Sequence, residues 1–134
     1  MSTNKEIMTA IYAEIAKGNG RPYVEALADD VTFRAIGSNS WSVKIKGKEE
    51  LVREVYARVR ERMEGPLRSH ATRILADGDF VVVQARGDNT LKDGRRYAND
   101  YCLVFRFKDG KIQEIEEYLD TELVTEVLGE RIVA

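Results

Sequence analysis

The sequence predicts an α+β fold in which helices cover one face of a curved antiparallel sheet. Before residue 66, the two longest apolar patterns repeat with the helical period of 3.6 residues. From residue 67 to 119 the apolar residues alternate with the period of two that is typical of strands, and Asp77-Gly78 and Asp109-Gly110 are turn signals between them. A sheet of this kind, strongly curved, can wrap around its helices and leave an apolar cone open at one end.

Length and composition predict one globular domain over residues 1–134. Hydrophobic residues make up 43% of the chain and charged residues 33%, which excludes a disordered chain. The formal net charge of −2 gives no basic excess for nucleic acid, and no apolar run is long enough to cross a membrane. The first residues lack the apolar stretch of a secretory signal, so we expect a cytoplasmic protein.

The residues that most often build metal and cofactor sites are scarce. The chain has one cysteine, Cys102, and one histidine, His70, which excludes an internal disulfide and a site built on two histidines. It also lacks a phosphate-binding loop and a dinucleotide fingerprint. We therefore expect no metal and no cofactor, and we expect His70 and Cys102 on the surface or in an interface.

The N-terminal half predicts three helices and two strands. A capping box at Thr3 and Glu6 begins the first helix, and Gly18-Asn19-Gly20 ends it. Gly65-Pro66 ends the last of the three helices. The remaining predicted elements are a short helix from residue 21 to Asp29-Asp30, strands over 31–35 and 41–46, and a helix over 48–63.

The C-terminal half predicts a four-strand meander followed by a short helix. Its strands are expected over 67–76, 80–90, 97–108 and 111–119. Asp120 directly precedes an apolar helical segment and is expected to cap that helix.

Alternation along the strands indicates which side chains face the cone. The bulky face of the third strand carries Asn99 and Tyr101, and the apolar face of the fourth strand carries Glu117. On the second strand both faces are partly apolar, so alternation alone does not choose between them. If Gln84 and Arg86 point inward, they join Asn99, Tyr101 and Glu117, and pairing of Arg86 with Glu117 compensates two charges.

Glu117 is the candidate catalytic residue. An apolar cone raises the pKa of its carboxyl group and a nearby Arg86 lowers it. As a base it could take a proton next to a carbonyl group, with Asn99, Tyr101 or Gln84 stabilising the enolate oxygen. A buried structural ion pair of Glu117 with Arg86 is the alternative.

Four aromatic residues are expected to line the cone, namely Tyr12, Phe33, Trp41 and Tyr56. Core packing alone would explain each of them. Together they could form the wall of a pocket for a flat, apolar ligand.

Two stretches of the chain resemble the SnoaL-like branch of the nuclear transport factor 2-like superfamily. The first is DGRRYANDY at 93–101, followed by VFRF at 104–107. The second is DGKI at 109–112, leading to EYLDT at 117–121. The resemblance covers nearly the whole chain, and it implies a conical α+β barrel with an internal pocket and a homodimer built on the outer sheet face.

The superfamily contains enzymes and proteins that only bind ligands. Limonene epoxide hydrolases use an arginine and two aspartates at positions that fall at Gln84, Arg86 and Glu117, where only Glu117 keeps its chemistry. The early strand lacks the acid that ketosteroid isomerases need. SnoaL-type polyketide cyclases use an inner aspartate as acid and base, and Glu117 is its nearest equivalent.

Three functions follow as hypotheses. The protein binds a small apolar, carbonyl- or ring-bearing molecule in a conical pocket. Alternatively, it is a cofactor-free isomerase, cyclase or dehydratase in which Glu117 acts as general acid and base. In the third hypothesis the cone is filled by its own side chains, and the chain is a dimerisation or scaffold module.

Overall fold

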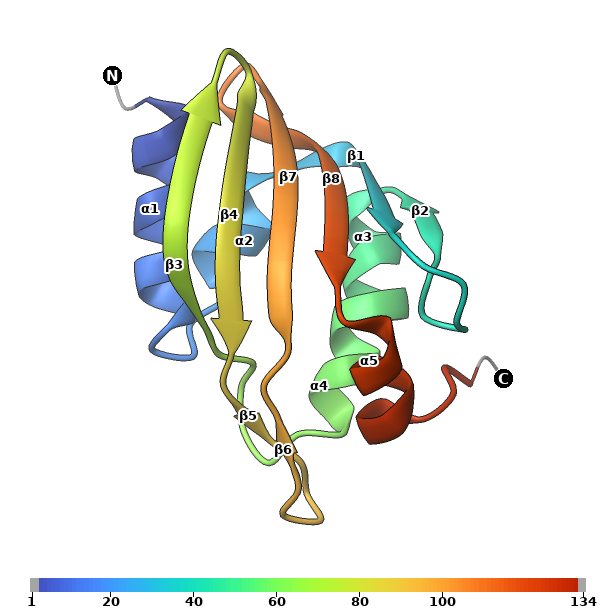
Figure 1. The fold of residues 1–134 in the computed structure, drawn as a ribbon. Coiled ribbons are helices and arrows are strands. Elements are labelled where there is room, and N and C mark those ends of the chain that lie inside the picture. Colours follow the sequence, from blue (N-terminus) through green and yellow to red (C-terminus); the bar gives the residue numbers. More distant parts are fainter. Residues whose placement is uncertain (1–2, 133–134) are drawn as a thin grey trace.

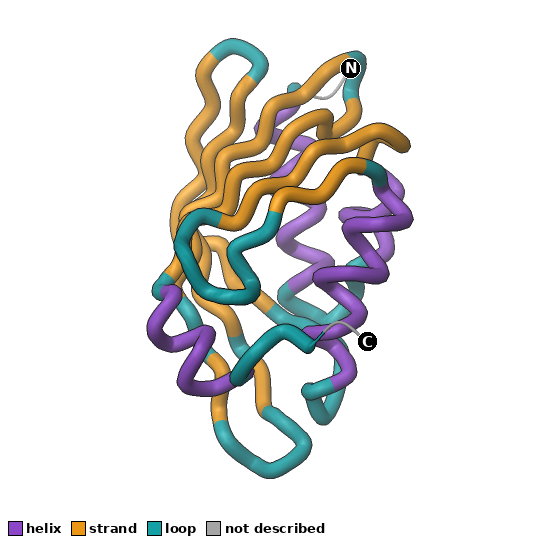
Figure 2. Tube along the Cα trace, turned by 90° about the vertical axis from the view of Figure 1, so that its right-hand side faces the viewer, coloured by secondary structure: helices purple, strands orange, loops and turns teal. Residues whose placement is uncertain are grey.

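The computed structural model describes residues 3–132 and places helices on one face of a six-stranded sheet (Figures 1 and 2). The strand order is β2-β1-β8-β7-β4-β3, with β1 parallel to β8 and the other neighbours antiparallel. A separate two-stranded sheet, β5-β6, extends below the main sheet in Figure 1. The α+β prediction is confirmed.

The elements have the following bounds. The helices are α1 (Asn4–Ile15), α2 (Arg21–Ala26), α3 (Lys48–Leu51), the π-helical turn η1 (Val52–Tyr56), α4 (Ala57–Glu61) and α5 (Thr121–Leu128). The strands are β1 (Leu27–Ala35), β2 (Lys44–Lys46), β3 (Ser69–Asp77), β4 (Phe80–Gly87), β5 (Asn89–Thr90), β6 (Arg96–Tyr97), β7 (Asp100–Lys108) and β8 (Lys111–Leu119).

Both predicted N-terminal caps are present. Thr3 and Glu6 form the capping box of α1, with hydrogen bonds of 3.0 and 3.1 Å between side chain and backbone. The Asp120 carboxylate accepts hydrogen bonds from the backbone N–H groups of Glu122 and Leu123 at the start of α5. These ends are encoded locally, since each cap bonds to residues within three positions of it.

The helix predicted over 48–63 forms with a local irregularity. Its middle turn, η1, is wider than an α-helical turn, because the Ala57 N–H donates to the carbonyl of Val52, five residues earlier. Val55 and Tyr56, at the end of this turn, both line the cavity described below. Figure 2 shows most of the helical segments on one side of the sheet, whereas α5, which leads to the C-terminus, lies apart from them at the lower end.

Four strands differ from their predicted bounds by three residues or more. The first begins at Leu27 rather than Val31, so Asp29 and Asp30 are exposed residues within this strand and do not end α2. The strand predicted over 41–46 is shortened to β2, because the Asn39 side chain accepts from the Trp41 N–H and holds that segment in a turn. The two long central strands are each interrupted, before β5 and after β6.

The buried residues form two clusters. The larger one lies between the sheet and helices α1, α2 and α3–η1, and includes Met8, Phe105 and Ile115. The smaller one lies at the α5 end and includes Trp41 and Tyr97. A cavity between these clusters positions the candidate site.

Candidate functional site

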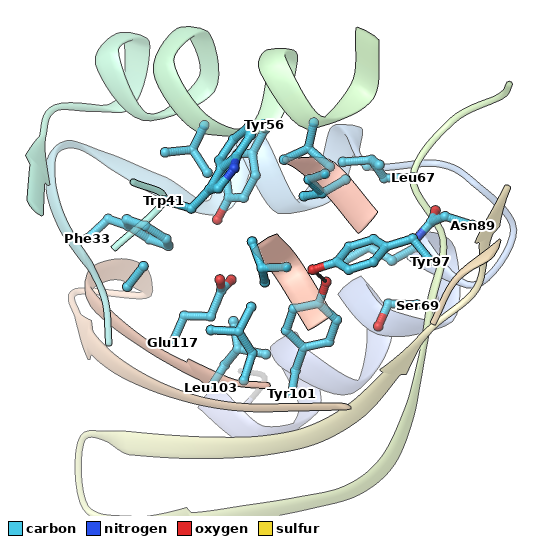
Figure 3. A pocket seen from close by; sticks show the side chains of 18 of the residues that line it. Phe33, Trp41, Tyr56, Leu67, Ser69, Asn89, Tyr97, Tyr101, Leu103 and Glu117 are labelled. Atoms are coloured by element: carbon cyan, nitrogen blue, oxygen red, sulfur yellow. Dashed lines mark hydrogen bonds between the residues drawn. The ribbon is translucent and has the colours of Figure 1, made fainter. Parts of the chain in front are cut away.

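The cavity has a volume of about 250 Å³ and opens between the two core clusters. Its wall is mostly apolar and comes from the concave face of the sheet, α1, α2, the η1–α4 helix, the 36–42 loop and α5 (Figure 3). The structure brings together six of the nine predicted site residues in this wall: Tyr12, Phe33, Trp41, Tyr56, Tyr101 and Glu117.

Gln84 and Arg86 do not join the cavity, so the condition that they point inward is not met and their assignment to the site is wrong. Strand β4 buries Val81, Val83 and Ala85 instead, and its pairing with β7 runs without a bulge that could reverse the phase. Arg86 is 63% exposed on the outer face and lies 3.6 Å from Asp100, not beside Glu117. The buried ion pair of Arg86 with Glu117 is therefore absent.

Asn99 is fully buried, but it lies behind the cavity wall. Its amide nitrogen donates to the Tyr97 hydroxyl at 3.0 Å and to the Asp120 carbonyl at 3.0 Å, and its oxygen accepts from the Asp120 N–H at 3.1 Å. Asn99 thus joins the break between β6 and β7 to the end of β8. Its contribution to the site is to position Tyr97.

Glu117 enters the cavity from β8, opposite Leu103 on β7 and Ala35 on β1. Its carboxylate points into the open space (Figure 3). Among residues 3–132, no cation and no hydrogen-bond donor contacts that carboxylate. The apolar surroundings remove solvation from the ionised form and raise the pKa of Glu117 from 4.5 to about 7. Near neutral pH the group can therefore both accept and give a proton.

Tyrosine is the main polar residue around Glu117. Five of the six tyrosines in the chain line the cavity, and the sixth, Tyr118, lies exposed on the outer sheet face. Burial raises the pKa of each cavity tyrosine: Tyr12, Tyr23, Tyr56, Tyr97 and Tyr101. Their hydroxyl groups therefore stay protonated and can donate hydrogen bonds at neutral pH.

The hydroxyl of Tyr97 is the best placed of these donors. It accepts hydrogen bonds from Asn99 and, at 3.3 Å, from the Tyr101 hydroxyl. Accepting two hydrogen bonds leaves its own proton free and makes that proton a better donor. Figure 3 shows the hydroxyls of Tyr97 and Tyr101 meeting in the centre of the cavity, next to the space that Glu117 faces.

The wall residues that the sequence interpretation missed include Tyr23, Arg68, Asn89 and Tyr97. Tyr97 carried a signal, because it shares the inner face of its strand with Tyr101. The hydroxyls of Tyr23 and Tyr56 lie 2.6 Å apart although the residues are 33 positions apart, and no local pattern links them. Arg68 and Asn89 come from the ends of predicted strands, where alternation stops.

The remaining candidates lie outside the cavity. His70 is exposed, and its Nε2 lies 2.9 Å from Asp88, which also pairs with Arg96 at 2.6 Å. The hydrogen bond from Arg96, followed by that from His70, lowers the pKa of Asp88 to about 2. Cys102 lies half-buried on the outer sheet face, where the alternation placed it.

Within residues 3–132 no group of three or more histidine, cysteine, aspartate or glutamate side chains could hold a metal ion. None of the helices in this range is long and apolar enough to span a membrane.

Comparisons with known proteins place the fold in a broad group. The profile of the SnoaL-like domain matches residues 8–115. A nuclear transport factor 2-like protein from Burkholderia thailandensis has 22% identity and a TM-score of 0.81, covering 96% of this chain and 98% of that one. TerC, co-crystallised with polyporic acid, has 23% identity and a TM-score of 0.77, covering 95% and 98%.

A third similar structure is a protein with a ketosteroid isomerase-like fold from Catenulispora acidiphila, in complex with trimethylamine. It has 21% identity and a TM-score of 0.74, covering 96% of this chain and 95% of that one. At these identities the likeness shows the fold and no shared chemistry. None of the curated protein sequences matches the chain.

Proposed function

The chain belongs to the SnoaL-like domain family, and from this premise we propose that it is a cofactor-free enzyme that binds a small, ring-bearing carbonyl compound and moves a proton on it with Glu117. The observation that carries the proposal is an unpaired carboxylate facing an open, apolar cavity. A structural glutamate of this kind would be expected to have a cationic partner, because an isolated buried charge is costly.

The proposed reaction begins with the ionised Glu117 carboxylate. It takes a proton from the carbon next to the substrate carbonyl, and the electron pair of that C–H bond moves to form an enolate. The Tyr97 hydroxyl donates a hydrogen bond to the enolate oxygen, where the negative charge develops. In a substrate with a C=C bond conjugated to the enolate, the protonated Glu117 then returns the proton to the far carbon of that system. The electron pair of the old C=C bond forms the new C–H bond and the double bond moves next to the carbonyl, so atoms and charge balance without a co-reactant.

The size of the cavity limits the substrate. A dry apolar cavity of about 150 Å³ holds one benzene ring, and ordinary ligand pockets span about 300–1,000 Å³. At about 250 Å³ this cavity suits a molecule of one or two rings. TerC was co-crystallised with polyporic acid, which supports a small organic ligand for a protein of this fold.

Hydrogen exchange tests the proposal with 2-tetralone, a two-ring ketone with acidic C–H bonds. In D₂O, we expect the wild-type protein to accelerate exchange next to the carbonyl, as followed by NMR. General acid–base groups contribute about 10²–10⁴-fold, so Glu117→Gln should lose at least about 100-fold. Glu116→Gln is the matched control, because Glu116 lies on the outer face of the same strand, 3.5 Å from Arg34.

Binding without reaction is the second candidate, favoured by the largely apolar wall. It would be supported if 2-tetralone binds equally well to the wild type and Glu117→Gln but neither accelerates exchange. Exchange at the same rate in both proteins would contradict the role of Glu117. Absence of binding would contradict a two-ring ketone site in either candidate.

We also propose that a second copy of the chain covers the outer sheet face. Three large apolar side chains are exposed there, namely Leu75, Phe80 and Tyr118. Their exposure in one chain supports burial in an interface. Light scattering should give the mass of a dimer for the wild type, and Tyr118→Glu should shift it toward the monomer; a wild-type monomer would contradict the proposal.

A further inference from the structure

Arg68 lines the part of the cavity that lies away from Glu117. Figure 3 shows its chain neighbours Leu67 and Ser69, together with Asn89, on the opposite side of the cavity from Glu117. Among residues 3–132, Glu117 and Arg68 are the only acidic or basic residues in the cavity wall. The acidic and the basic residue of the wall therefore lie at opposite sides of the cavity.

The Arg68 side chain is exposed, and its charge is not neutralised by a neighbouring side chain among residues 3–132. A Cβ atom added at Gly18 would lie 3.2 Å from Arg68 Nη2, so the guanidinium passes close over bare glycine backbone beyond the end of α1. Gly18 has a φ of +88°, a conformation that glycine adopts without strain. Within residues 3–132, the guanidinium has no carboxylate partner and donates no hydrogen bond. Its charge is therefore available to a ligand.

Asn89 supplies a second donor beside it. Only 7% of Asn89 is exposed, and its Oδ1 accepts the backbone N–H of Arg68 at 2.8 Å. Because only the amide oxygen can accept that bond, the orientation of the amide is fixed, and its Nδ2 has no acceptor in the described part of the chain. Every side-chain nitrogen in residues 3–132 that is fully covered has a hydrogen-bond partner, so the unpaired Nδ2 of Asn89 keeps some exposed surface. Asn89 is itself part of the cavity wall.

We propose that the ligand is a ring-bearing carboxylate, whose carboxylate group binds between the Arg68 guanidinium and the Asn89 amide nitrogen while its rings extend toward Glu117. This inference rests on the proposed function, since it names the substrate class of the same cavity. One cationic and one neutral hydrogen-bond donor match a carboxylate group, which carries one negative charge shared by two oxygens. The doubly charged form of a phosphate would leave one charge uncompensated against an apolar wall.

Calorimetry with two probes that share one ring system tests the inference: 2-naphthoate and the neutral 2-naphthamide. We expect the wild type to bind the carboxylate about tenfold more tightly than the amide, which is the usual scale of one charge-assisted hydrogen bond. Arg68→Gln should remove this preference and leave the affinity for 2-naphthamide unchanged. Arg86→Gln, an exposed arginine on the outer face, should keep it.

A second variant tests the amide nitrogen. Asn89→Asp keeps an oxygen that can accept the Arg68 N–H but removes the donor, so it should weaken 2-naphthoate binding about tenfold or more. Thermal melting checks that both variants remain folded.

The outcomes separate this inference from the proposed function. If 2-naphthamide binds and Arg68→Gln leaves the affinity for 2-naphthoate unchanged, the carboxylate site is wrong while the ligand cavity stands. If neither probe binds the wild type, both the inference and a two-ring ligand in this cavity are wrong.

Discussion

Replacement of Glu117 by glutamine should change how the stability of the protein depends on pH. The apolar cavity raises the pKa of Glu117 to about 7, whereas the unfolded chain has the ordinary value of 4.5. Because the folded-state pKa lies above the unfolded one, the folded protein binds the proton more tightly. The resulting stability is fully present below pH 4.5 and is lost as the pH rises through 7.

The size of this loss follows from the two pKa values. Each pKa unit corresponds to about 1.4 kcal/mol, so the rise of the Glu117 pKa from 4.5 to about 7 corresponds to about 3 kcal/mol. Glutamine has nearly the same shape and never ionises. Relative to Glu117→Gln, the wild type should therefore lose about 3 kcal/mol of unfolding free energy between pH 4.5 and about pH 9. Proteins of this size are stabilised by roughly 5–15 kcal/mol, so the effect is large.

Urea denaturation of both proteins at several pH values is the measurement. The difference between the two proteins isolates Glu117, because every other group titrates in both. The tyrosines packed around it have pKa values raised further above 10, so they stay neutral across this range. Glu116→Gln should lack the effect. Parallel curves for the wild type and Glu117→Gln would refute the reasoning, since they would mean that water solvates the carboxylate in the cavity.

Two further substitutions test the packing and the capping. Phe105→Ala removes a fully buried ring from the larger core cluster and should lower the unfolding free energy by about 3–5 kcal/mol. Phe80→Ala removes an exposed ring and should lower it by about 1 kcal/mol or less. Equal losses in urea denaturation would contradict the assigned faces of β4 and β7. Asp120→Ala removes the acceptor for two backbone N–H groups of α5 and should lower the unfolding free energy by about 1 kcal/mol. An unchanged midpoint of urea denaturation would show that the cap does not stabilise the protein.

The orientation of Glu117 could be predicted because its strand has one clearly apolar face. Ile115 and Leu119 flank it two residues away on either side, and the neighbouring strand presents bulky residues on the same face. Period-two alternation then places Glu117 inward whatever the rest of the fold does. Tyr101 was placed in the wall by the same argument.

The orientation of Gln84 and Arg86 could not be predicted, because both faces of β4 are partly apolar. Alternation gives the relative phase of neighbouring residues, and only pairing with β7 and β3 decides which face is covered. Val82 ends on the outer face, where the single chain leaves it only half-buried. The same pairing gives Arg86 its partner, Asp100, which lies 14 positions away in the sequence.

The sequence by itself determined the helix caps, the α+β order, the inner faces of the third and fourth meander strands and the inward Glu117. Each of these depends on residues close together in the chain, whose spacing is fixed by helix and strand geometry. Only the tertiary structure decided that Glu117 has no partner, that Tyr97 receives two hydrogen bonds, and that Arg68 and Asn89 meet at the far side of the cavity. Arg68 and Asn89 lie 21 positions apart and meet only when their segments pack together, which local patterns do not predict. Asn99 and Tyr101 lie within four positions of Tyr97, but their bonds to it depend on the break between β6 and β7, which alternation does not predict either.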